Sequence, residues 1–197
     1  MSKKTNQNKR LKKSINFSMS IAVITFVLAA IFSVISSSLL NGVVWGIGIL
    51  IILLIVLIGI LFDTIGIAST AATEQPFHAM ASEKIFGAKE AVYIIRNADR
   101  FASFCNDVVG DIAGIISGTA TAVVVIQLAQ NIGYGEGTAI HITINVIVTS
   151  IVAALTVGGK AIGKYFALHI STDIMLFAGK VLAFFNKLFK FKKFNDN

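Results

Sequence analysis

The stretch VVWGIGILIILLIVLIGILF occupies residues 43–62 and contains no charged side chain. About 20 consecutive apolar residues let an α-helix cross the hydrocarbon core of a bilayer, and this stretch supplies them. The uncharged stretch FSMSIAVITFVLAAIFSVISSSLL precedes it at residues 17–40, and two more polar candidates follow at residues 101–130 and 138–157. The sequence therefore predicts an all-α, polytopic membrane protein with about four transmembrane helices.

The composition points to the same class. Of the 197 residues, 55% are hydrophobic, 14% are charged and one is proline, and the mean hydropathy is +0.81. These values exclude a cytosolic enzyme. Cys105 is the only cysteine, so no internal disulfide forms, and no zinc-ligand spacing occurs. The chain also lacks the P-loop, GxSxG, HExxH and CxxC motifs, and we expect no enzymatic activity.

The basic residues are distributed unevenly about the predicted spans. Of the seventeen Lys and Arg residues, six precede the first span, four lie between the second and third spans, and seven follow from Lys160 onward. The short connections at residues 41–42 and 131–137 contain none. By the positive-inside rule, both termini and the central loop are expected in the cytoplasm of a cell-membrane protein. This pattern favours lipid head groups over nucleic acid as the partner.

The two ends of the chain are both basic. Residues 1–16 are predicted to be a cytoplasmic N-terminus before a leading span at residues 17–40. A secretory signal peptide is the alternative, but the apolar run is too long for one. Residues 186–197 form a basic-aromatic tail at the end of KVLAFFNKLFKFKKF, in which Phe alternates with Lys. We expect this stretch to anchor on an anionic leaflet, and an RNA-binding strip is the weaker alternative.

The central loop contains its own helical pattern. Pro76 suits a first helical position. After it, apolar residues recur at spacings of three and four, namely Phe77, Ala81, Ile85, Ala88, Val92 and Ile95. This spacing predicts an amphipathic helix that lies on the cytoplasmic interface or on the helix bundle.

The third span contains a polar and glycine-rich stretch, CNDVVGDIAGIISG. Asp107 and Asp111 are four residues apart and share a helix face, where they are joined by three small residues that favour close helix packing: Gly110, Gly114 and Gly118. A charged residue near the bilayer centre costs at least about 2.5 kcal/mol, so each carboxylate needs neutralisation. A metal cation, protons, or the ammonium groups of Lys160 and Lys164 are the alternatives. The register allows Asp111 to face Lys160 and Asp107 to face Lys164.

The order of several stretches resembles the membrane domain of the CNNM/CorC magnesium transporters. These stretches are FDTIGIASTA, GAKEAVYIIRNADRFAS, the glycine-rich polar span and GKAIGK. In that family the corresponding stretches resemble FSGSETA, GAKLA followed by NPDRFLS, a span with paired Asn residues, and GEIIPK. The resemblance assigns residues 43–185 to such a domain. It implies a homodimer that binds Mg²⁺ or Co²⁺ among polar residues, and cytosolic CBS domains that are not expected here.

The polar residues offer a candidate metal site, and the resemblance implies an obstacle to it. Asp63, Asn106, Asp107 and Asp111 would supply oxygen ligands of the kind that Mg²⁺ prefers. Lys160, however, stands where the family has its cation-binding Glu, and Lys164 matches the family's Lys. An ammonium group beside a divalent ion opposes its binding. The alternative is therefore a non-transporting scaffold or accessory subunit, in which Asp/Lys pairs replace the ion site.

Overall fold

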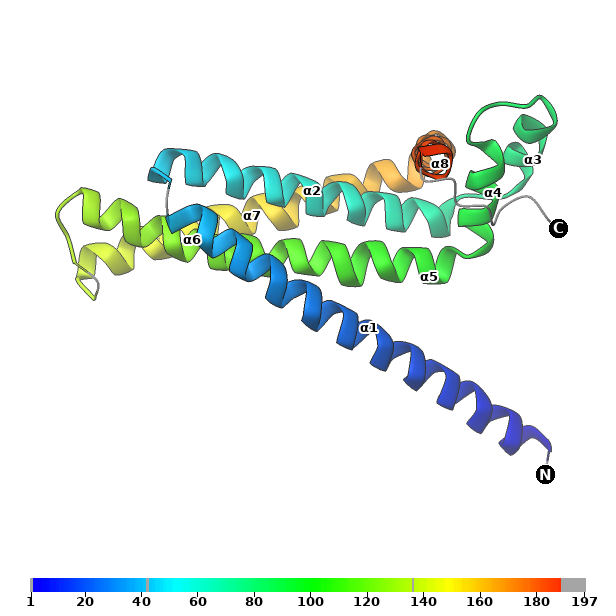
Figure 1. Cartoon of the computed structure of the whole chain (residues 1–197), viewed down its shortest axis with the longest axis horizontal. Coiled ribbons are helices and arrows are strands. Elements are labelled where there is room, and N and C mark those ends of the chain that lie inside the picture. Colours follow the sequence, from blue (N-terminus) through cyan, green and yellow to red (C-terminus); the bar gives the residue numbers. More distant parts are fainter. Residues whose placement is uncertain (1, 42, 136, 189–197) are drawn as a thin grey trace. The chain divides into compact units, whose positions relative to one another are not determined.

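The structure, a computed structural model, describes residues 2–41, 43–135 and 137–188. Within this part of the chain it is helical and contains no β-strand, so the predicted all-α fold is confirmed (Figure 1). The elements are α1 (Ser2–Asn41), α2 (Trp45–Ala71), α3 (Gln75–Ser82), α4 (Ala88–Arg96), α5 (Ala98–Ser103), the π-helical η1 (Phe104–Gly110), α6 (Asp111–Asn131), α7 (Ala139–His169) and α8 (Ser171–Leu188).

Four helical segments are long and apolar enough to cross a bilayer, as the sequence predicted. They are Ser14–Ser38, Trp45–Ala71, Ala98–Asn131 and Ala139–His169. The third runs without interruption through α5, η1 and α6. The first belongs to α1, which also includes most of the basic N-terminal residues. Of the basic-aromatic tail, residues 189–197 lie outside the described residues.

The fourth helix differs from its predicted extent. The hydropathy pattern predicts that this span ends at residue 157, before a pair of glycines, but α7 continues without a break to His169. At Gly159 this helix packs closely on α2, since an added Cβ there would overlap Ile60. Lys160 and Lys164 therefore lie within the helix.

The chain divides into two compact units that each draw on several of the long helices. The first comprises Met1–Val56 and Asp111–Ala153, and the second comprises Leu57–Gly110 and Ala154–Asn197. In the first unit α1 packs against α6. Leu40 is buried there, and its carbonyl accepts a 2.7 Å hydrogen bond from Gln127 Nε2 of α6. This bond gives a partner to a carbonyl in the last turn of α1, where intrahelical partners are missing.

The second unit is built around a core of fully or nearly buried side chains. Its members come from α2, α3, α4, α7 and α8, and they are Ala68, Phe77, Ala91, Val92, Ile94, Ala167 and Met175. Helix α8 packs on α4 where two glycines meet: a Cβ on Gly179 would overlap the carbonyl oxygen of Gly87. This unit contains the candidate site described below.

The central segment forms two helices, so the prediction of one continuous amphipathic helix is wrong. Helix α3 ends at Ser82 and α4 begins at Ala88. Between them, Lys84 and Gly87 have positive φ values of 59° and 86°. A glycine adopts this conformation at little cost. The tight contact of Gly87 with α8 stabilises the break between the two helices. The spacing of apolar residues along the chain cannot predict this contact.

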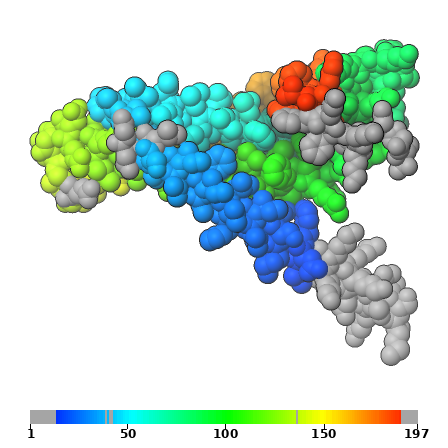
Figure 2. All heavy atoms as spheres, in the orientation of Figure 1, coloured from blue at the N-terminus to red at the C-terminus, as the bar shows by residue number. Residues whose placement is uncertain are grey.

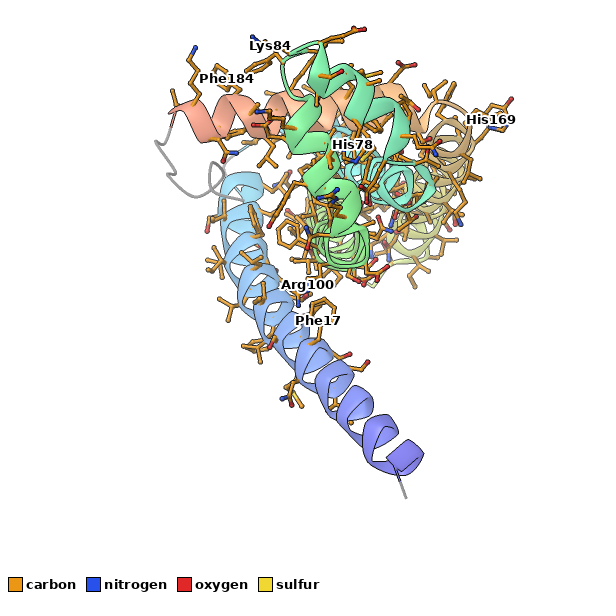
Figure 3. All side chains as sticks on the ribbon, turned by 90° about the vertical axis from the view of Figure 1, so that its right-hand side faces the viewer. Phe17, His78, Lys84, Arg100, His169 and Phe184 are labelled. Carbon is orange, nitrogen blue, oxygen red and sulfur yellow. The ribbon has the colours of Figure 1, made fainter. Side chains whose placement is uncertain are left out.

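An ion pair joins the two central helices. Arg96 Nε of α4 donates a 3.0 Å hydrogen bond to Glu74 Oε2, immediately before α3, and His78 Nε2 lies 3.1 Å from the same oxygen. His78 is labelled in Figure 3. The hydrogen bond from Arg96, and then that from His78, hold the pKa of Glu74 below its ordinary value. The carboxylate therefore remains charged at neutral pH and holds α3 against α4.

Candidate functional site

The site is centred on an ion pair between α2 and α7. Lys160 Nζ lies 3.5 Å from Asp63 Oδ1, and the two side chains are 27% and 16% exposed. Both residues fall inside helices that are long and apolar enough to span a bilayer. A carboxylate in that setting requires a positive partner. The ammonium group of Lys160 provides one.

Two glycines of α7 bring the helices close enough for this contact. Gly159 and Gly163 are one turn apart and face Ile60 and Thr64 of α2, which are also one turn apart. A Cβ on either glycine would overlap its partner side chain. This is a small-xxx-small contact, in which missing side chains allow two helices to approach closely. Lys160 adjoins Gly159, so the same contact brings its ammonium group to Asp63.

The third span approaches the ion pair through its π-helical segment. A Cβ on Gly110, the last residue of η1, would lie 3.6 Å from Asp63 Oδ1 and 3.6 Å from Lys160 Nζ. The spacing of Asp107 and Asp111 predicts a regular α-helix here, whereas residues 104–110 form a π-helix. Such segments are rare and frequently occur at functional sites. Gly110 is therefore a close neighbour of the charges, beyond its predicted role in helix packing.

Asn106 adds a polar group from the same segment. Its Oδ1 is buried and has no hydrogen-bond partner among the described residues. It lies against Gly66 of α2, where an added Cβ would overlap this oxygen. A buried amide oxygen without a partner is unusual, because leaving it unsatisfied costs about 1–3 kcal/mol. Among the predicted ligands in the described part of the second unit, only Asn106 thus has a side-chain oxygen that is buried and has no hydrogen-bond partner.

The other predicted site residues occupy different settings. Asp107 and Lys164 have exposed side chains, and Asp111 begins α6 in the first compact unit. Gly114 and Gly118 meet no described atom within 4 Å of an added Cβ. In the described part of the chain, no three His, Cys, Asp or Glu side chains converge on one point.

The Asp63–Lys160 pair was not among the pairings expected from the sequence. The matching spacing of four instead predicts Asp111 and Asp107 of the third span as partners of Lys160 and Lys164. The second span also contained a signal, since Asp63 directly follows a stretch of twenty uncharged residues.

Comparison with known proteins adds no assignment: no family model, curated protein or solved structure matches the chain.

Proposed function

We propose that this chain is a non-transporting, multi-pass scaffold or accessory subunit of the cell membrane, in which Lys160 takes the place of a bound cation beside Asp63. The 3.5 Å separation of Lys160 Nζ from Asp63 Oδ1 carries the proposal. The ammonium group neutralises the carboxylate and repels a divalent ion at the same position. The resemblance to CNNM/CorC membrane domains supports this reading, because Lys160 stands where those proteins have an acidic ligand.

A second candidate function is the handling of Mg²⁺ or Co²⁺ at the same polar site. One observation favours it, namely the buried Oδ1 of Asn106 without a partner in the described residues. In this alternative, a divalent ion displaces Lys160 and takes oxygens from Asp63 and Asn106, while water fills the remaining positions, as Mg²⁺ commonly retains waters.

Thermal stability in the presence and absence of Mg²⁺ separates the two functions. A ligand that binds only the folded state raises stability by mass action. If Lys160 replaces the ion, the unaltered protein in detergent has the same melting temperature with and without Mg²⁺. Lys160→Glu then adds a second carboxylate beside Asp63 and gains a Mg²⁺-dependent increase. Lys164→Glu is the matched control, because this exposed lysine lies one turn away on α7.

Two outcomes would contradict the scaffold proposal. The first is a Mg²⁺-dependent stabilisation of the unaltered protein that Asp63→Asn removes, which would favour the divalent-cation function. The second is an equal response to Mg²⁺ in Lys160→Glu and Lys164→Glu, which would show that the position of Lys160 has no special relation to an ion site.

The proposal also includes orientation and assembly. Both termini and the central segment are cytoplasmic, as the distribution of Lys and Arg predicts. The protein is a homodimer, as the family resemblance implies.

A further inference from the structure

Helix α8 has two apolar faces with different side chains. The inner face consists of Met175, Gly179 and Ala183, which follow one another at intervals of four residues and are buried. These residues lie against α4, and the closest approach is between the backbones at Gly179 and Gly87. The inner face is therefore already covered by protein.

The outer face contains larger apolar side chains that no protein covers in the described structure. Phe177 lies two residues from Gly179, which corresponds to about half a turn of an α-helix. The outer residues and their exposed fractions are Phe177 at 62%, Val181 at 40%, Phe184 at 58% and Leu188 at 63%. Their spacing of three and four residues makes a continuous stripe along the helix. Water alone is an unfavourable environment for such a stripe.

The direction of α8 suits a position in the membrane interface. In Figure 1, α8 is seen end-on, whereas the later parts of α2 and α7 run across the view. Figure 2 shows α8 in red against the green segment that contains α3 and α4. Thus α8 runs crosswise to two candidate spans, and it follows α7 after only one intervening residue. A helix placed in this way lies parallel to the bilayer surface if α2 and α7 cross it.

Two lysines accompany the outer face of α8. Lys180 and Lys187 are both exposed. They are seven positions apart, so they lie on the same side of the helix. Long lysine side chains extend their ammonium groups toward lipid head groups while the helix remains at the apolar boundary. Phe184, labelled in Figure 3, belongs to the apolar stripe beside them.

We propose that α8 is a lipid-binding interfacial helix, which inserts Phe177, Val181, Phe184 and Leu188 into the leaflet and binds anionic phospholipid head groups through Lys180 and Lys187. This inference rests on the membrane-spanning part of the proposed function and not on the role of Lys160. Charge complementarity favours an anionic leaflet over a second copy of this chain, whose own α8 has the same positive charges.

Tryptophan fluorescence in proteoliposomes tests the insertion. The chain has one tryptophan, Trp45, at the start of α2. Brominated phosphatidylcholine quenches a tryptophan that contacts acyl chains, so native Trp45 reports whether the chain is inserted. In a Trp45→Phe background, Phe184→Trp reports on α8, and we expect it to be quenched. If Trp45 is quenched but Phe184→Trp is not, the α8 proposal fails. If neither tryptophan is quenched, membrane insertion itself fails.

Energy transfer from Phe184→Trp to dansyl-labelled lipids tests the head-group preference. We expect transfer to labelled phosphatidylglycerol to exceed transfer to labelled phosphatidylcholine in mixed vesicles. Lys180→Gln with Lys187→Gln should reduce this preference by up to about 25-fold, since each of the two basic residues near an anionic surface contributes about fivefold. The matched control is Lys180→Arg with Lys187→Arg, which keeps both positive charges and should change the preference less than twofold. Equal transfer to both lipids, or equal effects of the two variant pairs, would overturn the anionic preference.

Discussion

Gly163 controls the separation of α2 and α7 at the level of a single residue. An added Cβ there would overlap Thr64 Oγ1, which also donates a 2.7 Å hydrogen bond to the Ile60 carbonyl. Gly163→Ala should therefore force the helices apart and reduce the free energy of unfolding by about 1–3 kcal/mol, as overpacking does elsewhere. Denaturation of the purified protein in mixed micelles measures this change.

Gly158→Ala is the control for this substitution. Gly158 lies in the same helix, but no described atom comes within 4 Å of an added Cβ. Alanine is a better helix former than glycine by about 1 kcal/mol. We therefore expect Gly158→Ala to be neutral or stabilising. A loss of stability as large as that of Gly163→Ala would show that the packing of α7 on α2 is not the cause.

At the scale of elements, Glu74 holds α3 against α4. Its pKa is lowered by the hydrogen bond from Arg96 and then by that from His78. A carboxylate with a depressed folded-state pKa stabilises the fold above its unfolded-state pKa, and this stabilisation is lost as pH falls through the folded-state pKa. The protection factors of the α3 backbone amides, which are the intrinsic exchange rate divided by the observed rate at each pH, should thus fall as the pH drops below about 4.5, the ordinary pKa of this group.

Glu74→Gln should remove this pH dependence and accelerate exchange in α3 at neutral pH. Hydrogen–deuterium exchange read by mass spectrometry measures both effects. Glu83→Gln removes the same charge from an exposed position just after α3 and should leave the pH dependence in place. If Glu74→Gln retains the full pH dependence, another group controls the α3–α4 contact.

The elements also show how far sequence patterns extend. Hydropathy predicted four spans because an apolar run of about 20 residues is typical of a helix that crosses a bilayer. The helical period of the central loop was correct on both sides of Gly87, yet it could not reveal the break, because the cause is a contact with Gly179 more than ninety residues later. Likewise, spacing along the chain could not reveal that Lys160 lies beside Asp63, because packing between distant helices produces this contact.

At the scale of the whole molecule, the charge distribution predicts which segments face the cytoplasm. Cys105 is the only cysteine and is buried, so Cys105→Ala provides a cysteine-free background. In that background, Glu83→Cys in the central segment should react with a membrane-impermeant maleimide only after cells are opened. Tyr134→Cys between α6 and α7 should react on intact cells. The reverse labelling pattern would indicate the opposite topology. Labelling of both positions from the same side of the membrane would exclude an odd number of spans between them.

Lys160 as the resident counter-charge of Asp63 is the central claim, and a double-mutant cycle on these residues tests it most directly. Unfolding free energies would be measured in lipid–detergent micelles for Asp63→Asn, Lys160→Met and the combination. Other contacts of Lys160 cancel in the cycle, so the coupling term reports this pair. We predict a coupling of at least about 1 kcal/mol, with the combined variant more stable than the sum of the single losses implies. Strict additivity of the two substitutions would contradict the claim.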